Sequence, residues 1–142
     1  MRPVFAVPFI LALMSISTGA QSDPIKARQA LMKDMGAQTQ IGAAMVKGST
    51  PFDAAKAVEI FKSFAADGAK IGALFPEGSN QGDTKALPAV WSNRAGFDAA
   101  LAAFKTSVAD NSAKIGTADG FKTAFTAVAQ TCRACHTNFK SY

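Results

Sequence analysis

The feature that most constrains this chain is a pentapeptide near its carboxyl end, Cys132-Arg133-Ala134-Cys135-His136. It contains both cysteines and the single histidine of the 142-residue sequence. On a helix, Cys132 lies three residues from Cys135 and four from His136, so the three side chains share one face. C-x-x-C-H is the attachment signature of c-type haem: the thiols bond to the porphyrin edge and the imidazole becomes an axial ligand of the iron. The motif therefore predicts one covalent haem c.

Two other chemistries use the same cysteine spacing. A tetrahedral zinc site needs roughly four ligands, whereas Cys and His together number three here, and three on one helical turn would leave the metal half open. A redox dithiol of the thioredoxin type is expected near a βαβ pattern, whereas this motif lies in a long amphipathic helical pattern. We therefore expect Cys132 and Cys135 to form the haem thioethers and His136 to be the proximal iron ligand; a haem-free dithiol protein is the remaining alternative.

The first twenty residues have the pattern of a secretory signal peptide. Met1-Arg2-Pro3 gives a short basic start, residues 4–16 are almost wholly apolar, and residues 17–20 are small or polar. The apolar run is too short to cross a bilayer. We expect cleavage after Ala20, which leaves residues 21–142 as a single periplasmic domain without a membrane span. Export agrees with the motif, because haem is attached to such cysteines outside the cytoplasm.

The charge of the chain is mildly positive, with a formal net value of +5. Acids and bases are mixed along the sequence, without the clustered Lys and Arg and the groove-entering motif that nucleic-acid binding requires. The balance suits docking onto an acidic redox partner protein, and it equally suits an ordinary solvated surface. No acid–base or nucleophilic constellation is evident, so we predict that the protein is not an enzyme.

Hydrophobic periodicity predicts helices and no convincing strand. The first helix covers residues 25–47 and follows Asp23-Pro24, an N-cap with proline at the first helical position. The second follows Asp53 as its cap and ends at Pro76. Its apolar face is expected to include Val58.

A loop rich in Gly, Ser, Asn and Asp, residues 76–88, separates the second helix from the third. The third helix begins near Pro88, and Asp98 is expected to cap it afresh after Gly96. The fourth begins near Ala118 and carries the haem motif on the same face as its core phenylalanines. Four such helices with short-to-medium loops describe an all-α, antiparallel four-helix bundle that buries the haem.

Taken as a whole, the sequence resembles the cytochrome c′ family, the class II c-type cytochromes. That family is a four-helix bundle with its C-x-x-C-H motif near the carboxyl end, and the resemblance covers essentially the whole mature chain. It implies that Arg28 and Gln29 lie in the haem pocket, with an exposed helix charge as the alternative for Arg28, and it allows a homodimer. The matching segments are Arg28-Gln29, Met45 to Gly48, Phe75-Pro76, Leu87 to Trp91 and the terminal motif with Phe139 and Lys140.

The resemblance also raises the question of the sixth iron ligand. Most members of the family leave that position open behind an apolar side chain, whereas the low-spin cytochrome c-556 branch places methionine there, and the corresponding residue is Met32, one helical turn after Arg28. Independently, no second histidine exists, and the methionines of the mature chain, Met32, Met35 and Met45, all lie in the first predicted helix. Met35 is the competing ligand, and methionine on such a helix is ordinarily core filler. We predict a low-spin electron carrier ligated by His136 and Met32, with a five-coordinate protein that binds nitric oxide or carbon monoxide as the alternative.

Overall fold

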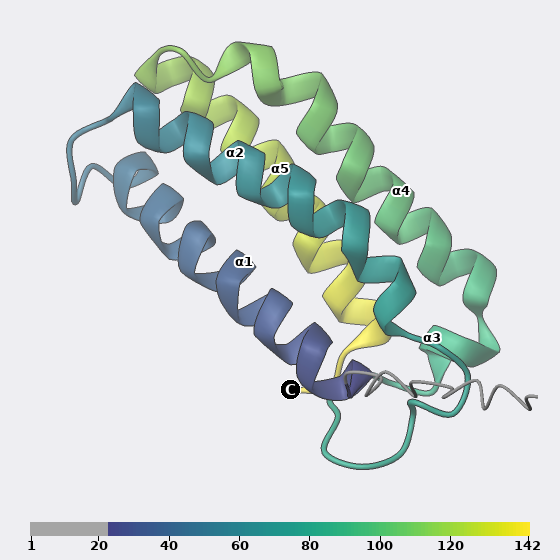
Figure 1. The fold of residues 1–142 in the computed structure, drawn as a ribbon. Helices are drawn as coiled ribbons and strands as arrows, with labels where there is room; N and C mark the ends of the chain where they lie inside the picture. Colours follow the sequence, from purple (N-terminus) through teal and green to yellow (C-terminus); the bar gives the residue numbers. More distant parts are fainter. Residues whose placement is uncertain (1–22) are drawn as a thin grey trace, which may run out of the picture.

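The structure is a computed structural model that describes residues 23–142. The signal peptide predicted for residues 1–20 lies outside the described residues. Four long helices, each antiparallel to the next along the chain, form a bundle (Figure 1). They are α1 (Pro24–Val46), α2 (Ala54–Lys70), α4 (Arg94–Asn111) and α5 (Ala118–Phe139).

Three short helical turns complete the secondary structure. The 3-10 turn η1 (Ile71–Leu74) continues the end of α2, so the second predicted helix finishes with a tighter turn before Pro76. Helix α3 (Ala89–Ser92) precedes α4, and the 3-10 turn η2 (Ser112–Lys114) follows it. Residues 23–142 contain no β-strand, only one isolated antiparallel bridge between Ala86 and Lys140. The predicted all-α four-helix bundle is confirmed.

Local sequence explains where α1 and α2 begin. The carboxylate of Asp23 accepts a hydrogen bond from the backbone N–H of Ile25 at 2.9 Å, and Pro24 occupies the first helical position, where a backbone N–H has no helical partner. The carboxylate of Asp53 accepts from the N–H of Lys56 at 3.0 Å. Both predicted N-caps are confirmed.

The break in the third predicted helix lies earlier than expected. Helix α3 ends at Ser92, and the side chain of Asn93 accepts a hydrogen bond from the N–H of Gly96 at 3.2 Å, which makes Asn93 the N-cap of α4. Asp98 lies inside α4, where its carboxylate accepts from Nε of Arg94 at 2.9 Å. The prediction of a cap at Asp98 was wrong because Gly96 is held within the first turn of α4 by the Asn93 cap and does not interrupt the helix.

The predicted apolar face of α2 is buried except at its first residue. Phe61, Phe64 and Ile71 are buried, whereas Val58 is 41% exposed and Ala57 and Ile60 are buried in its place. Gly68 lies on the same face, where an added Cβ would meet the ring of Phe104 at 2.8 Å. The prediction for Val58 was wrong because helical periodicity alone does not show which of two adjacent apolar positions faces the neighbouring helices.

An aromatic core fills the middle of the bundle and the part near the α1–α2 connection. Its buried rings have centroids 5.4 to 6.4 Å apart and come from Phe61, Phe64, Phe104, Phe121 and Phe125. Gly42 of α1 packs directly on the ring of Phe125. The opposite end of the bundle, where the 75–88 loop crosses close to the carboxyl terminus (Figure 1), is the end that holds the candidate site.

Candidate haem site

A cavity of about 510 Å³ opens at the end of the bundle crossed by the 75–88 loop. Side chains from α1, η1, the loop, α4 and α5 line it, and its volume is in the range of small-molecule and cofactor pockets. Much of the wall is apolar. The apolar lining residues are Met32, Ile71, Phe75, Ala86, Phe97, Leu101 and Phe139.

The structure brings most of the predicted site residues together at this cavity. Cys132 lies one turn before His136 on α5, is half-buried and packs against the core. The other predicted residues line the cavity directly, from α1 on one side and α5 on the other; they are Arg28, Gln29, Met32, Cys135 and His136.

His136 is held in the protonation state that metal ligation needs. Burial lowers the pKa of His136, and the positive charge of Lys140 lowers it further. The imidazole is therefore neutral at neutral pH, and neutral imidazole is the form of histidine that binds a metal.

The surroundings of the two cysteines disfavour the thiolate form. Burial raises the pKa of the Cys132 and Cys135 thiols, and the proximity of Cys135 adds to the effect at Cys132. Reactive dithiols need the opposite shift, because the thiolate is the nucleophile. Within residues 23–142, no group of three or more His, Cys, Asp or Glu side chains is placed to hold a metal ion.

The three methionines of α1 lie in different surroundings. Met32 is half-buried and lines the same cavity as His136. Met35 and Met45 are buried members of the hydrophobic core and do not line the cavity. Of the predicted sixth ligands, Met32 is therefore the one that the fold places in the same cavity as His136.

Arg28 is buried and is committed to the 75–88 loop. Its side chain is 4% exposed, which rules out the alternative of an exposed helix charge. Nη1 donates to the carbonyl oxygen of Leu74 at 3.1 Å and to Oγ of Ser79 at 3.0 Å. Nη2 donates to the carbonyl oxygen of Ser79 and to Oγ1 of Thr84, both at 2.7 Å. The guanidinium carbon also lies 4.8 Å from the ring centroid of Phe75, so Arg28 holds the loop by hydrogen bonds and by a cation–π contact.

The mouth of the cavity is mainly basic. Lys33, Lys85 and Lys140 line it, and Asp83 is the carboxylate among its lining residues. Gln29 also ties α1 to the loop, since its Nε2 donates to the carbonyl oxygen of Asp83 at 2.8 Å. The ammonium groups of these lysines are suited to form ion pairs with the carboxylates of a bound cofactor.

The far end of the loop is joined to the end of α5 by backbone pairing that the sequence did not reveal. The N–H of Leu87 donates to the carbonyl oxygen of Phe139 at 3.0 Å, and the N–H of Ser141 donates to that of Lys85 at 2.8 Å. These bonds flank the antiparallel bridge described above. Backbone pairing between single extended residues leaves no side-chain pattern in the sequence, so only the hydrogen bonds identify it.

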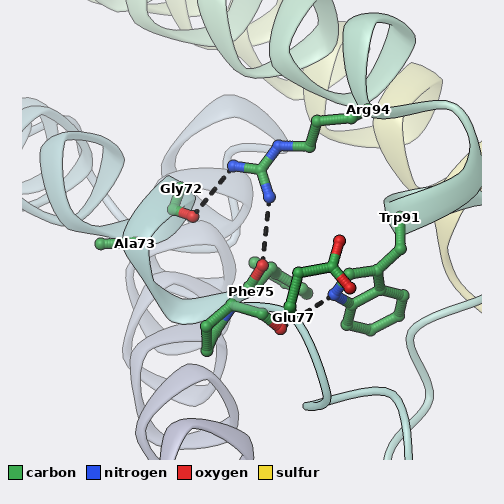
Figure 2. Close-up of a pocket in the computed structure, with 7 residues that line it drawn as sticks. Gly72, Ala73, Phe75, Glu77, Trp91 and Arg94 are labelled. Carbon is green, nitrogen blue, oxygen red and sulfur yellow. Dashed lines mark hydrogen bonds between the residues drawn. The ribbon is translucent and has the colours of Figure 1, made fainter.

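A second hollow, of about 350 Å³, is lined by residues of η1, the start of the loop, Trp91 and Arg94 (Figure 2). Arg94 donates there to the carbonyl oxygens of Phe75 at 3.1 Å and Gly72 at 3.4 Å. Nε1 of Trp91 donates to the carbonyl oxygen of Pro76 at 3.0 Å. Phe75 lines both the hollow and the larger cavity, whereas Trp91 lines the hollow and packs the loop onto the bundle.

The residues present fit a covalently attached haem. The walls are apolar, α5 supplies a neutral imidazole beside two thiols, and α1 supplies a thioether sulfur across the same cavity. Ammonium groups at the mouth match the two carboxylates of a haem. No helix in residues 23–142 is both long and apolar enough to cross a lipid bilayer.

The chain is similar in sequence and in fold to known proteins of one family. Residues 23–140 match the family described as Cytochrome C′. The chain is 35% identical over 136 residues to cytochrome c′ of Rhodopseudomonas palustris, covering 93% of each chain. It is 33% identical over 135 residues to cytochrome c-556 of the same organism, covering 92% of this chain and 91% of the other. The structure matches a solved cytochrome c′ from Rhodopseudomonas palustris with a TM-score of 0.81 at 35% identity, over 86% of this chain and 98% of that one. The chain therefore belongs to the cytochrome c′ family of monohaem electron carriers, whose haem c is covalently attached.

Proposed function

We propose that the protein is a periplasmic one-electron carrier whose iron is low-spin and axially ligated by His136 and Met32. The observation that supports the proposal is that these two side chains line one cavity from two different helices, α5 and α1. The remaining methionines of α1, Met35 and Met45, are buried in the core. With Cys135 used for attachment, the cavity offers the imidazole nitrogen of His136 and the thioether sulfur of Met32 as iron donors.

Each residue of the site has a distinct task in this proposal. When bound, haem supplies a ferric–ferrous couple. Cys132 and Cys135 fix it to α5 through thioether bonds, and His136 presents a neutral ring nitrogen. Met32 would supply a thioether sulfur to the iron, and such a ligand favours the ferrous state relative to a second imidazole. With both positions filled in both oxidation states, the protein reorganises little when an electron is transferred.

The proposed location follows from the signal peptide predicted for residues 1–20 and from the attachment of haem outside the cytoplasm. We propose that residues 1–20 are removed on export to the periplasm, where the protein meets redox partners not yet identified, as a monomer or homodimer. Intact mass measurement of the purified holoprotein should give a chain that begins at Gln21 and carries one haem. A chain that still contains residues 1–20 would contradict the proposal.

The alternative is a five-coordinate protein that binds nitric oxide or carbon monoxide at an open sixth position. The relative named cytochrome c′ matches slightly better, at 35% identity, than the relative named cytochrome c-556, at 33%. In this alternative, Met32 packs beside the iron without bonding to it.

Absorption spectra of the purified holoprotein separate the two functions. Methionine ligation predicts sharp, split α and β bands in the reduced protein and a red-edge sulfur-to-iron charge-transfer band in the oxidised protein. A broad high-spin spectrum, or rapid carbon monoxide binding by the reduced wild-type protein, would refute ligation and support the alternative.

Replacement of Met32 identifies the ligand. Met32→Ala should abolish the charge-transfer band, because it removes the thioether that lines the cavity. Met35→Leu is the matched control: it changes a buried methionine one turn further along the same helix and should leave the band in place. A band that survives in Met32→Ala and is lost in Met35→Leu would assign the sixth position to Met35.

A further inference from the structure

We infer that Arg28 is a positioning residue for the iron site: by clamping the 75–88 loop to α1, it fixes the separation between Met32 and His136. The inference rests on the proposed function, since it concerns what holds Met32 in the sixth position. It assigns Arg28 a role directed at the loop and at coordination, whereas the family resemblance had suggested only that Arg28 lies in the haem pocket.

The clamp is rigidly joined to Met32. Arg28 precedes Met32 by one turn of α1, about 6 Å along the helix axis. All four N–H donors on Nη1 and Nη2 are used, on Leu74, Ser79 and Thr84. Charged hydrogen bonds of this kind are among the strongest in proteins, and a buried guanidinium that lost them would have no water to replace them. The position of α1 beside the cavity is therefore coupled to the position of the loop.

The other end of the loop is joined to the helix that carries His136. Backbone hydrogen bonds connect Leu87 to Phe139 and Lys85 to Ser141. The carbonyl oxygen of His136 itself accepts a hydrogen bond from the N–H of Lys140, in the last turn of α5. The loop thus forms a continuous tie from Arg28, one turn before Met32, to the turn that follows His136.

The tie matters because α1 packs directly on α5 toward its other end, where Gly42 lies on the ring of Phe125. At the level of Met32 and His136, side chains of both helices line the cavity. With one end of α1 fixed at Gly42, the loop governs how far the other end stands from α5, and a thioether bond to iron forms only over a narrow range of that separation.

Arg94 provides a matched control. Its side chain lines the second hollow and donates hydrogen bonds to the carbonyl oxygens of Gly72 and Phe75, at the start of the same loop (Figure 2). It belongs to α4, however, which carries neither axial residue. Replacing Arg94 removes an arginine and two carbonyl contacts from this end of the loop but leaves the link between α1 and the loop intact.

The test compares Arg28→Gln, Arg28→Lys and Arg94→Gln with the wild-type holoprotein. Arg28→Gln should weaken the charge-transfer band of the oxidised protein and raise the carbon monoxide association rate of the reduced protein about tenfold, as expected when charged hydrogen bonds are lost. Arg28→Lys should behave like Arg28→Gln, because one ammonium cannot span the acceptors of a guanidinium fork. Arg94→Gln should resemble the wild type. Full rescue by Arg28→Lys, or an equal effect of Arg94→Gln, would overturn the inference.

A double-mutant cycle separates positioning of Met32 from simple opening of the cavity. If Arg28 acts through Met32, then in a Met32→Ala background Arg28→Gln should change the carbon monoxide association rate by less than about twofold. A tenfold rise in the association rate in that background would mean that the loop controls access of carbon monoxide to the cavity independently of Met32, and it would overturn the inference.

Two further observations keep the outcomes distinct. If Arg28→Gln does not yield holoprotein, Thr84→Val removes one of the four acceptors and should shift both measurements in the same direction by about threefold; no shift would overturn the inference. Absence of the charge-transfer band in the wild type would refute the proposed function itself. A band that is present in the wild type and unchanged in Arg28→Gln would refute only the role of Arg28.

Discussion

At the scale of single residues, the carboxylate of Asp67 lies in surroundings that disfavour its negative charge. Oγ of Ser63 lies between two carboxylates, 3.5 Å from Asp67 on α2 and 3.1 Å from Asp34 on α1. Burial raises the pKa of Asp67, the negative charge of Asp34 raises it further, and Lys70 at 3.7 Å offsets part of the effect. The α1–α2 contact therefore carries a carboxyl group that folding makes easier to protonate.

Replacing Asp67 with Asn should stabilise the holoprotein at pH 7 and not in acid. A carboxyl group whose pKa is raised by folding binds more protons in the folded state, so its unfavourable contribution is absent below the unfolded pKa, about 3.9, and grows as pH rises. The gain in unfolding free energy should stay below about 1 kcal/mol, because loss of the Lys70 pair opposes it. Thermal melts of Asp67→Asn and of the exposed α4 variant Asp110→Asn, each at pH 7 and at a pH below about 3.9, test this. An equal gain at both pH values would contradict it.

At the scale of secondary-structure elements, α1 contains two glycines in opposite surroundings. A Cβ added to Gly42 would overlap the ring of Phe125, with Cδ2 and Cζ at 2.8 Å. A Cβ added to Gly36 would meet nothing within 4 Å. The first glycine is a packing requirement of the helix pair, whereas the second only weakens the helix.

The two alanine variants should therefore change stability in opposite directions. Gly42→Ala should lower the free energy of unfolding by about 1–3 kcal/mol, because the core near Phe125 must give way. Gly36→Ala should raise it by about 0.5–1 kcal/mol through helix propensity. Denaturant titrations of both holoproteins measure the difference. A destabilised Gly36→Ala would show that this face of α1 is packed in the holoprotein.

The elements also show what the sequence could and could not predict. The N-caps at Asp23 and Asp53 were predictable because a cap bonds within its own first turn. The motif of Cys132, Cys135 and His136 was predictable because the chemistry dictates the spacing. The partners of Arg28 were not: Ser79 and Thr84 lie 51 and 56 residues further along the chain.

The path of the 75–88 loop depends on its backbone conformation, which amino-acid composition alone does not predict. Gly78 and Gly82 have φ values of 80° and 102°, in the region that favours glycine. Glycines predict that such a loop turns, but they do not say which side chain the turn will face. The loop was therefore predictable as a loop, whereas its role as the tie between α1 and α5 came only from its hydrogen bonds.

At the scale of the whole molecule, the bundle is built around space that the protein alone does not fill. Preventing attachment with the double replacement Cys132→Ala and Cys135→Ala should lower the free energy of unfolding by at least about 3 kcal/mol, because the walls of a cavity of about 510 Å³ lose their packing partner. Chemical denaturation followed by circular dichroism measures the loss. Stability equal to that of the holoprotein would mean that the cavity closes without haem.

The walls of that cavity begin at Arg28 and end at Lys140, so nearly the whole described chain must be in place before the cavity exists. A haem free in solution would have to find a pocket whose walls are far apart in the sequence. The proposed thioether bonds tether it in advance, on α5. Its entry then becomes an intramolecular event, governed by an effective concentration on the order of millimolar for a short tether. The walls need only orient a haem that is already present; they need not capture one.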